Sequence, residues 1–124
     1  MKEAVSREVT KYSWSDIKAE QLNPLLTRKL ITGDRVMISQ LILKKGAIVP
    51  AHHHENEQVT YIISGSLKFD MSGKEVILLA GDVLHIPSNV VHSAIALEDT
   101  IDLDVFSPPR QDWLDGTDHY LRGQ

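Results

Sequence analysis

Cysteine is absent from the 124-residue sequence, which excludes disulfide bonds, thiolate nucleophiles, iron–sulfur clusters and cysteine-ligated zinc. Long apolar runs are absent too: no stretch approaches the ~18 residues of a membrane helix, and residues 1–10 are too polar for a secretory signal peptide. Positive charge is not in excess, because 13 Lys and Arg face 17 Asp and Glu, a net charge of -4. We therefore expect a cytoplasmic protein that binds neither nucleic acid nor a membrane surface.

The sequence does contain a series of short apolar runs separated by turn-forming residues. This pattern is typical of an all-β sandwich or barrel, and the chain length suits one domain over residues 1–124. We place the barrel core at about 26–106, between an N-terminal arm (1–25) and a C-terminal tail (107–124). The expected strands are 26–32, 36–43, 47–52, 58–63, 66–71, 75–79, 83–86, 92–97 and 100–106.

The two arms carry weaker signals. A short N-terminal helix is expected over residues 15–22, where Ser15 suits the N-cap position. Past Pro108 the chain cannot continue a central strand, because proline has no amide hydrogen to donate. The tail nevertheless contains Trp113 and Tyr120, which indicate that it packs against the barrel.

A cluster of histidines precedes one of the predicted strands. Alternate side chains of a strand share a face, so His52 and His54 point the same way and form a metal-ligand pair. Gln58 has the same parity, and His92 begins another apolar strand, so both are candidate further ligands. The alternatives are a solvated loop or the remnant of an affinity tag. A tag is disfavoured because the three adjacent histidines are internal and flanked by strand-like sequence.

Other titratable side chains near this cluster compete for a role. Glu55 and Glu57 are alternatives to Gln58 as the fourth ligand. Both have the opposite parity and lie in the predicted turn, so we expect solvated carboxylates there unless a bulge reorients them. His53 and His85 have off-face parity, and His119 lies in the polar tail. We expect these three histidines to be structural or solvated.

The last predicted strand alternates aspartate with aliphatic residues. One face carries Asp102, Asp104 and Phe106, which is either a solvated face or the lining of a barrel interior. A carboxylate inside the barrel would be a functional candidate, because burying an unpaired charge is costly. Arg110 follows two prolines that can aim it over the barrel mouth, and its planar fork suits bidentate binding of a carboxylate.

The spacing of these residues resembles the two motifs of the cupin superfamily. Residues 46–65 read G-x5-H-x-H-x3-Q-x6-G, with Gln58 where most cupins carry glutamate. Residues 81–92 read G-x5-P-x-N-x2-H, with Asn89 at the usual glycine and Ala96 at the usual final asparagine. The change at Asn89 is mild, because asparagine is the residue that best replaces glycine at positive φ.

The resemblance implies a double-stranded β-helix, or jelly-roll barrel, around one divalent transition metal held by His52, His54, Gln58 and His92. Nickel, zinc, iron, manganese, cobalt and copper all suit imidazole and amide ligands. Because these ligands are neutral, the charge of the ion stays uncompensated, which favours a small anionic substrate. Small cupins frequently pair, so we also expect a homodimer.

A second resemblance concerns the end of the chain. The arrangement Asp104-x-Phe106-x3-Arg110, with the metal set, is similar to the KdgF-type cupins, which linearise 4,5-unsaturated monouronates from pectin and alginate. It implies an isomerase in which Asp104 is the acid/base, Phe106 packs against the sugar and Arg110 holds its carboxylate. Three alternatives stay open: a metal-dependent dioxygenase of the quercetinase or cysteine-dioxygenase kind, a non-catalytic small-molecule or sugar-binding cupin, and a structural cupin that takes up metal only during purification.

Overall fold

The computed structural model describes residues 8–123. Its strands are β1 (Glu20–Asn23), β2 (Leu26–Thr32), β3 (Met37–Leu43), β4 (Ile48–His52), β5 (Glu57–Ser64), β6 (Ser66–Met71), β7 (Lys74–Leu79), β8 (Val83–Ile86), β9 (His92–Ala96) and β10 (Thr100–Ser107). The helical elements are the 3-10 turn η1 (Trp14–Asp16), the helix α1 (Gln111–Asp115) and the 3-10 turn η2 (His119–Leu121). Within residues 8–123, no helix is long and apolar enough to span a membrane.

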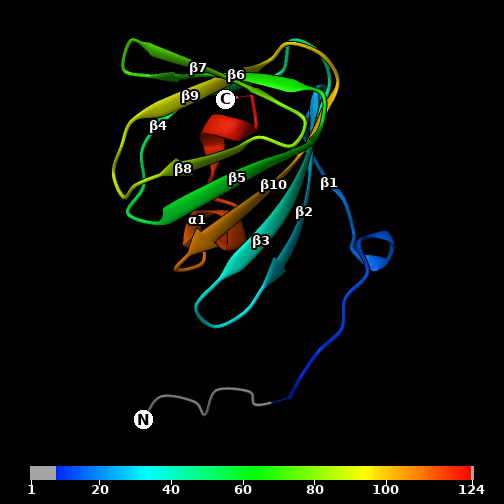
Figure 1. Cartoon of the computed structure of the whole chain (residues 1–124). Helices are drawn as coiled ribbons and strands as arrows, with labels where there is room; N and C mark the ends of the chain where they lie inside the picture. Colours follow the sequence, from blue (N-terminus) through cyan, green and yellow to red (C-terminus); the bar gives the residue numbers. More distant parts are fainter. Residues whose placement is uncertain (1–7, 124) are drawn as a thin grey trace.

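The strands form two antiparallel sheets that face each other (Figure 1). The larger sheet has the order β1-β2-β3-β10-β5-β8 and the smaller one the order β4-β9-β6-β7. Strands β2 to β10 match the nine predicted runs with ends that shift by at most one residue. The all-β jelly-roll expectation is therefore confirmed, because turn residues between short apolar runs mark strand ends reliably.

Two turn positions have a positive φ, which explains why glycine and asparagine occur there. Gly65 joins β5 to β6 with a φ of +88°, and a side chain there would collide with the backbone of Asp99. Asn89 has a φ of +64°, so it adopts the left-handed conformation expected of the residue that stands in for glycine before β9.

The space between the sheets is filled by inward side chains from both. On β6 the apolar residues Leu67 and Phe69 point inward, while Lys68 and Asp70 lie on the outer side. On β10, which pairs with β3 on one side and β5 on the other, the pattern is reversed. Its buried residues are Thr100, Asp102, Asp104 and Phe106, and its partly exposed ones are Ile101, Leu103 and Val105.

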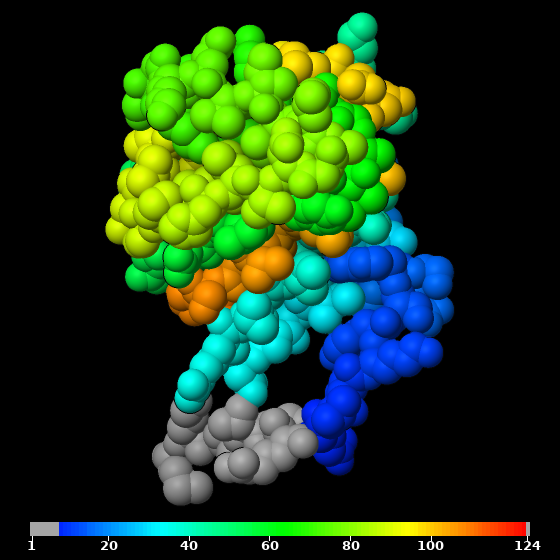
Figure 2. Space-filling view, viewed as in Figure 1, coloured from blue at the N-terminus to red at the C-terminus, as the bar shows by residue number. Residues whose placement is uncertain are grey.

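The N-terminal segment differs from the predicted helix over residues 15–22. Only η1 is helical, and the residues of β1 pair instead with β2. Leu22 is thereby buried in the core, and Glu20 lies opposite Arg28, with 3.2 Å between Oε1 and Nη2. A helix of that length is marginal alone, so the burial and ion pair of the extended form prevail. Figure 2 shows residues 8–19 projecting from the body of the molecule.

The C-terminal tail packs against both sheets, as its aromatic residues predict. The ring of Tyr120 lies 4.5 Å from that of His52 on β4, between centroids. On the other side, Nη1 of Arg28 on β2 donates to Oδ2 of Asp118 at 2.6 Å, with both side chains fully buried. The same guanidinium lies over the ring of Trp113 at 4.5 Å. The tail therefore connects the smaller sheet to the larger one.

Candidate metal centre and its surroundings

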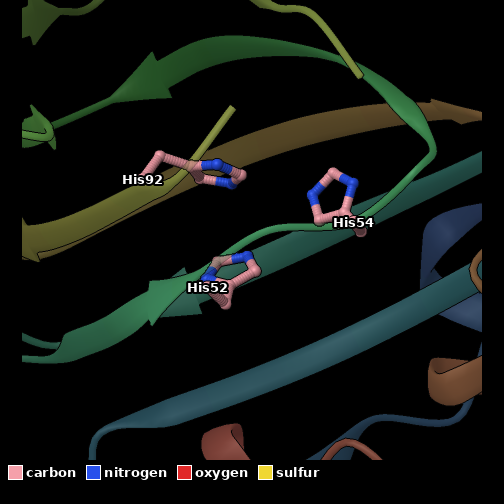
Figure 3. Close-up of side chains that lie close together, drawn as sticks. All are labelled: His52, His54 and His92. Atoms are coloured by element: carbon pink, nitrogen blue, oxygen red, sulfur yellow. The ribbon is translucent and has the colours of Figure 1, made fainter. Parts of the chain in front are cut away.

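Three histidines from separate segments converge between the sheets (Figure 3). His52 is the last residue of β4 and lies in register with His92, the first residue of β9. His54 lies in the connection from β4 to β5, two residues after His52. One ring nitrogen from each histidine lies within 4.8 Å of the corresponding atoms of the other two, so the three can hold a metal ion together.

Hydrogen bonds fix which nitrogen of each ring is free. Each Nδ1 lies 2.8 to 3.0 Å from a backbone carbonyl oxygen: His52 on Pro50, His54 on Asn56 and His92 on Val90. A carbonyl oxygen only accepts, so each Nδ1 carries the hydrogen and each Nε2 keeps its lone pair. Nε2 of His92 is buried and has no hydrogen-bond partner among the described residues. The three rings are therefore oriented as metal ligands.

Gln58 presents its carbonyl oxygen to the same place. The hydroxyl of Thr60 donates to Oδ1 of Asp104 at 2.6 Å, so it must accept from Nε2 of Gln58 at 2.8 Å. This fixes the amide orientation and leaves Oε1 of Gln58 3.1 Å from Nε2 of His54. Both atoms are acceptors, so no hydrogen bond joins them while His54 is neutral.

Two facing acceptors at this distance fit adjacent ligands of one metal ion. Bonds of ~2.1 Å at a right angle place two ligand atoms ~3.0 Å apart, close to the 3.1 Å between His54 and Gln58. The unpartnered Nε2 of His92 is explained in the same way. The donor set of three imidazoles and an amide oxygen thus fits a divalent transition metal.

The electrostatics keep the histidines neutral. Burial lowers the pKa of His52 to about 3 and that of His54 to about 4, and the charge of Arg110 lowers both further. Burial also lowers the pKa of His92. Protons therefore compete little for the lone pairs at neutral pH.

Two buried carboxyl groups lie behind the histidine cluster on β10. Asp104 receives hydrogen bonds from Thr60 and from Nε2 of Gln58, the latter at 3.5 Å. It is also hydrogen-bonded to Asp102. Burial and the charge of Asp104 raise the pKa of Asp102 well above its ordinary value, and burial raises the pKa of Asp104 as well. Asp102 therefore holds a proton and donates it to Asp104, whose own carboxylate is stabilised by its donors.

Arg110 lies over the ring of Phe106, with the guanidinium carbon 5.1 Å from the ring centroid. Its side chain is buried, and the hydrogens of Nε and Nη2 are all used in hydrogen bonds within the protein. Nε and Nη2 donate to the two carboxylate oxygens of Asp112 at 3.0 and 2.8 Å, and Nη2 also donates to the hydroxyl of Tyr120 at 2.8 Å. The bidentate fork expected for a substrate is therefore occupied by Asp112, and Nη1 alone has no partner among the described residues.

Two cavities lie beside these groups. The inner chamber measures about 30 Å³, and its lining includes His52 and His92 as well as Asp102, Asp104 and Phe106. At ~10–15 Å³ for each water, it holds about two water-sized groups. The outer cavity measures about 400 Å³ and lies beside the histidines and the tail. His52, Arg110 and Tyr120 line both cavities, so the two cavities lie next to each other at these side chains.

The remaining candidates lie away from the ring nitrogens. Glu57 approaches His85 at 2.6 Å on the exposed outer side of β5 and β8. His53 and Glu55 are exposed and line the outer cavity, and His119 is exposed in the tail. Gln58 therefore faces the histidines, and neither glutamate does.

Sequence reasoning did not assign a site role to Thr60, Asp112 or Tyr120. The parity of Thr60 follows from that of Gln58, so its inward position could have been predicted. Asp112 is two residues from Arg110, a weak signal for a local ion pair. Nothing near Tyr120 indicates that it packs on His52, because that contact depends on the path of the tail.

Comparisons with known proteins show the family and the fold of this chain. The cupin domain family model matches residues 39–107. The pectin degradation protein KdgF of Dickeya dadantii is 35% identical over 98 residues, which cover 77% of this chain and 89% of that protein. The structure of KdgF from Halomonas sp. is similar with a TM-score of 0.80 and 27% identity, covering 86% of this chain and 99% of that one. Quercetin 2,3-dioxygenase of Bacillus subtilis is 30% identical over 78 residues, 62% of this chain and 23% of that enzyme.

Proposed function

This chain belongs to the cupin family, and from that premise we propose that it is a metal-dependent isomerase that linearises 4,5-unsaturated monouronates. One observation carries the proposal: two residues of the histidine cluster, His52 and His92, line the same chamber as the buried acid Asp104 and the cation Arg110. A cationic site with a buried acid and no thiol suits proton transfer on a small anion.

The likeness to two KdgF proteins supports the substrate class. The protein of that name from Dickeya dadantii is a pectin degradation protein, and it is similar over most of both chains. Unsaturated monouronates are small anions with oxygen on nearly every carbon, so they match a site with a free Nη1 on Arg110 and a neutral ligand set. The outer cavity of about 400 Å³ has room for one such sugar.

The metal would be held by His52, His54, Gln58 and His92. When bound, such an ion supplies Lewis acidity that stabilises negative charge on a substrate oxygen. The chain's own contribution is to hold the four ligand atoms in place through the carbonyl groups and Thr60. It also keeps the imidazoles unprotonated by burying them.

Ring opening of the unsaturated sugar is an isomerisation that needs only proton transfers. The hemiacetal opens as a proton leaves the anomeric hydroxyl, the bond between the anomeric carbon and the ring oxygen breaks, and that oxygen takes a proton. The resulting enol becomes a ketone when its hydroxyl proton leaves and a proton adds to the neighbouring carbon of the double bond. In this proposal Asp104 holds and releases these protons, because burial raises its pKa while hydrogen bonds from Thr60 and Gln58 stabilise its carboxylate.

Arg110 positions the sugar relative to Asp104. The inner chamber is too small for a sugar ring, so the ring occupies the outer cavity, and one of its oxygens or a water reaches Asp104. The charge of Arg110, which lines both cavities, holds the carboxylate beside the inner chamber. Phe106, packed edge-on against His54 and Trp113, forms an apolar wall that excludes further water.

The test uses the purified protein with unsaturated galacturonate released by a polysaccharide lyase. The ultraviolet absorbance of the double bond should fall faster with metal-loaded protein than without protein. Chelator treatment should return the rate to the background, and restoring the metal should recover it. If metal-loaded protein gives no acceleration, the proposed reaction is wrong.

A dioxygenase is the second candidate function, favoured by the partial likeness to quercetin 2,3-dioxygenase. The observation against it is the pairing of Asp104 and Arg110 around the chamber, which dioxygen chemistry does not require. Oxygen consumption on addition of a flavonol or of cysteine to the iron-loaded protein decides between the two. Tight binding of the uronate without turnover or oxygen uptake would instead indicate a binding protein.

A further inference from the structure

The C-terminal tail forms one wall of both cavities, although it lies outside the part of the chain that the cupin domain model matches. The tail is fixed in place at several points. Nδ2 of Asn56 donates to the carbonyl oxygen of Pro108 at 2.6 Å, beside His54. Farther along, Asp118 is paired with Arg28 in the interior. The side chains of the tail that face the cavity are therefore held rigidly.

Arg110 has five N–H groups, and three of them are already used. Asp112 takes the hydrogen of Nε and one of Nη2, and the hydroxyl oxygen of Tyr120 takes the other hydrogen of Nη2. Only Nη1 remains, and it has no partner among the described residues. Arg110 therefore cannot form the usual two-nitrogen fork with a carboxylate, and a carboxylate at this place lacks a second donor.

Tyr120 has such a donor available. Its hydroxyl oxygen accepts from Nη2 of Arg110 at 2.8 Å and from Nε1 of Trp113 at 3.1 Å. A hydroxyl has two acceptor lone pairs, so both are used and its own hydrogen must point elsewhere. Tyr120 lines both cavities, and its ring lies against His52.

We propose that Tyr120 is a substrate-binding residue whose hydroxyl donates to one carboxylate oxygen of an acidic sugar, while Nη1 of Arg110 donates to the other. Asp112 and Trp113 act as positioning residues, because they fix the guanidinium and the hydroxyl that bind the ligand. The ligand class rests on the proposed function, but the clamp itself rests on the hydrogen-bond count at Arg110 and Tyr120. This clamp makes the tail a determinant of specificity for the carboxylate.

The test measures binding rather than turnover, by calorimetry on the metal-loaded full chain. D-galacturonate is the probe, and D-galactose, which lacks the carboxylate, is its neutral counterpart. Tyr120→Phe should weaken galacturonate binding about 10- to 100-fold, the effect of losing one hydrogen bond to a charged group. It should leave the weaker galactose binding and the metal content unchanged. The control is Tyr61→Phe, an exposed tyrosine on the outer side of β5, which should change nothing.

A purely structural role for Tyr120 predicts a different result. Tyr120→Phe would then lower the metal content, or weaken both sugars equally, and either outcome overturns the proposal. Unchanged galacturonate affinity in Tyr120→Phe overturns it too.

A second measurement does not depend on the folding of that variant. In Trp14→Phe, the remaining tryptophan is Trp113, whose Nε1 donates to the hydroxyl of Tyr120. Galacturonate should shift its fluorescence in a saturable way and galactose should not. If saturating galacturonate leaves the emission unchanged, the ligand does not engage this hydroxyl.

The outcomes separate this inference from the proposed function. Galacturonate has no double bond to isomerise, so its binding does not require turnover. A protein that binds it through Tyr120 but leaves the unsaturated sugar intact retains the clamp and contradicts the isomerase. A protein that turns over the unsaturated sugar with the same KM after Tyr120→Phe retains the isomerase and contradicts the clamp.

Discussion

Strands β6 and β10 lie in opposite sheets, and their polar and apolar residues are arranged in opposite ways. On β6 the inward residues are Leu67 and Phe69, and the outward ones are charged. On β10 the inward residues include Asp102 and Asp104, and the outward ones between them are aliphatic. Both strands alternate with period two, so the pattern of polarity alone does not tell which face is inside.

The difference shows where the molecule gives up stability for function. Burying a carboxyl group costs free energy unless hydrogen bonds or charges compensate it. Here Asp104 is compensated by Thr60, Gln58 and Asp102, whereas Oδ1 of Asp102 has no partner among the described residues. An arrangement that is unfavourable for folding, placed beside a histidine cluster, supports the proposal that β10 carries the chemistry, whereas the inner face of β6 contributes apolar core.

The largest expected effect on stability comes from the inner face of β6. Phe69→Ala removes a buried aromatic ring and should lower the free energy of unfolding by ~3–5 kcal/mol. Urea denaturation of the metal-free protein measures this, so that metal binding does not contribute. A loss below ~1 kcal/mol would mean that β6 does not carry the core, and the comparison with β10 would fail.

On the inner face of β10, a substitution is expected to raise the free energy of unfolding instead of lowering it. The pKa of Asp102 is raised above its ordinary 3.8, so the folded state holds a proton that the unfolded state releases. Its contribution to stability is therefore complete below about pH 4 and is lost as the pH rises towards the folded pKa. Asp102→Asn imitates the protonated form, so it should increase the free energy of unfolding at neutral pH. The variant's free energy of unfolding should also decrease less than that of the wild type as the pH rises above about 4. Urea denaturation of both metal-free proteins across this range measures it.

The control for that experiment is the same measurement at acid pH. Below the ordinary pKa of an aspartate, both states of the wild-type protein are protonated at position 102, so the variant should gain little there. If Asp102→Asn is less stable than the wild type at neutral pH, Asp102 is not protonated in the folded protein, and its burial needs another explanation.

The smallest effect is expected on the outer face of β6. Lys68 forms a contact of 3.5 Å with Glu75 in which both side chains are exposed. Such pairs contribute little, so Lys68→Ala should change the free energy of unfolding by less than ~0.5 kcal/mol. A larger loss, measured by the same urea series, would show that the outer face of the smaller sheet is covered in solution.

The sequence predicted the strands well because Gly and Asn mark their ends, as at Gly65 and Asn89. It missed β1 because the burial of Leu22 depends on a neighbouring strand and not on local helix signals.

The site was predictable where side-chain parity applies and not where the strand pairing is irregular or the chain leaves the sheets. Gln58 and Asp104 lie on the inward faces that counting alternate residues indicates. His52 follows a register irregularity after Val49, so counting alone does not place it. The orientation of Arg110 was not predictable, because it depends on Asp112 and Tyr120 in a tail that follows no strand period. Long-range packing of the tail determines the orientation of Arg110, and local sequence patterns do not reveal it.

The most direct test of the account is the initial rate of Asp104→Asn on unsaturated galacturonate, per mole of folded, metal-loaded protein. Asparagine keeps the shape of the side chain and removes its ability to transfer a proton, so kcat should fall ~10²- to 10⁴-fold, with metal content and unfolding midpoint close to those of the wild type. Turnover at the wild-type rate with the metal bound would contradict the claim that the buried acid of β10 carries the reaction.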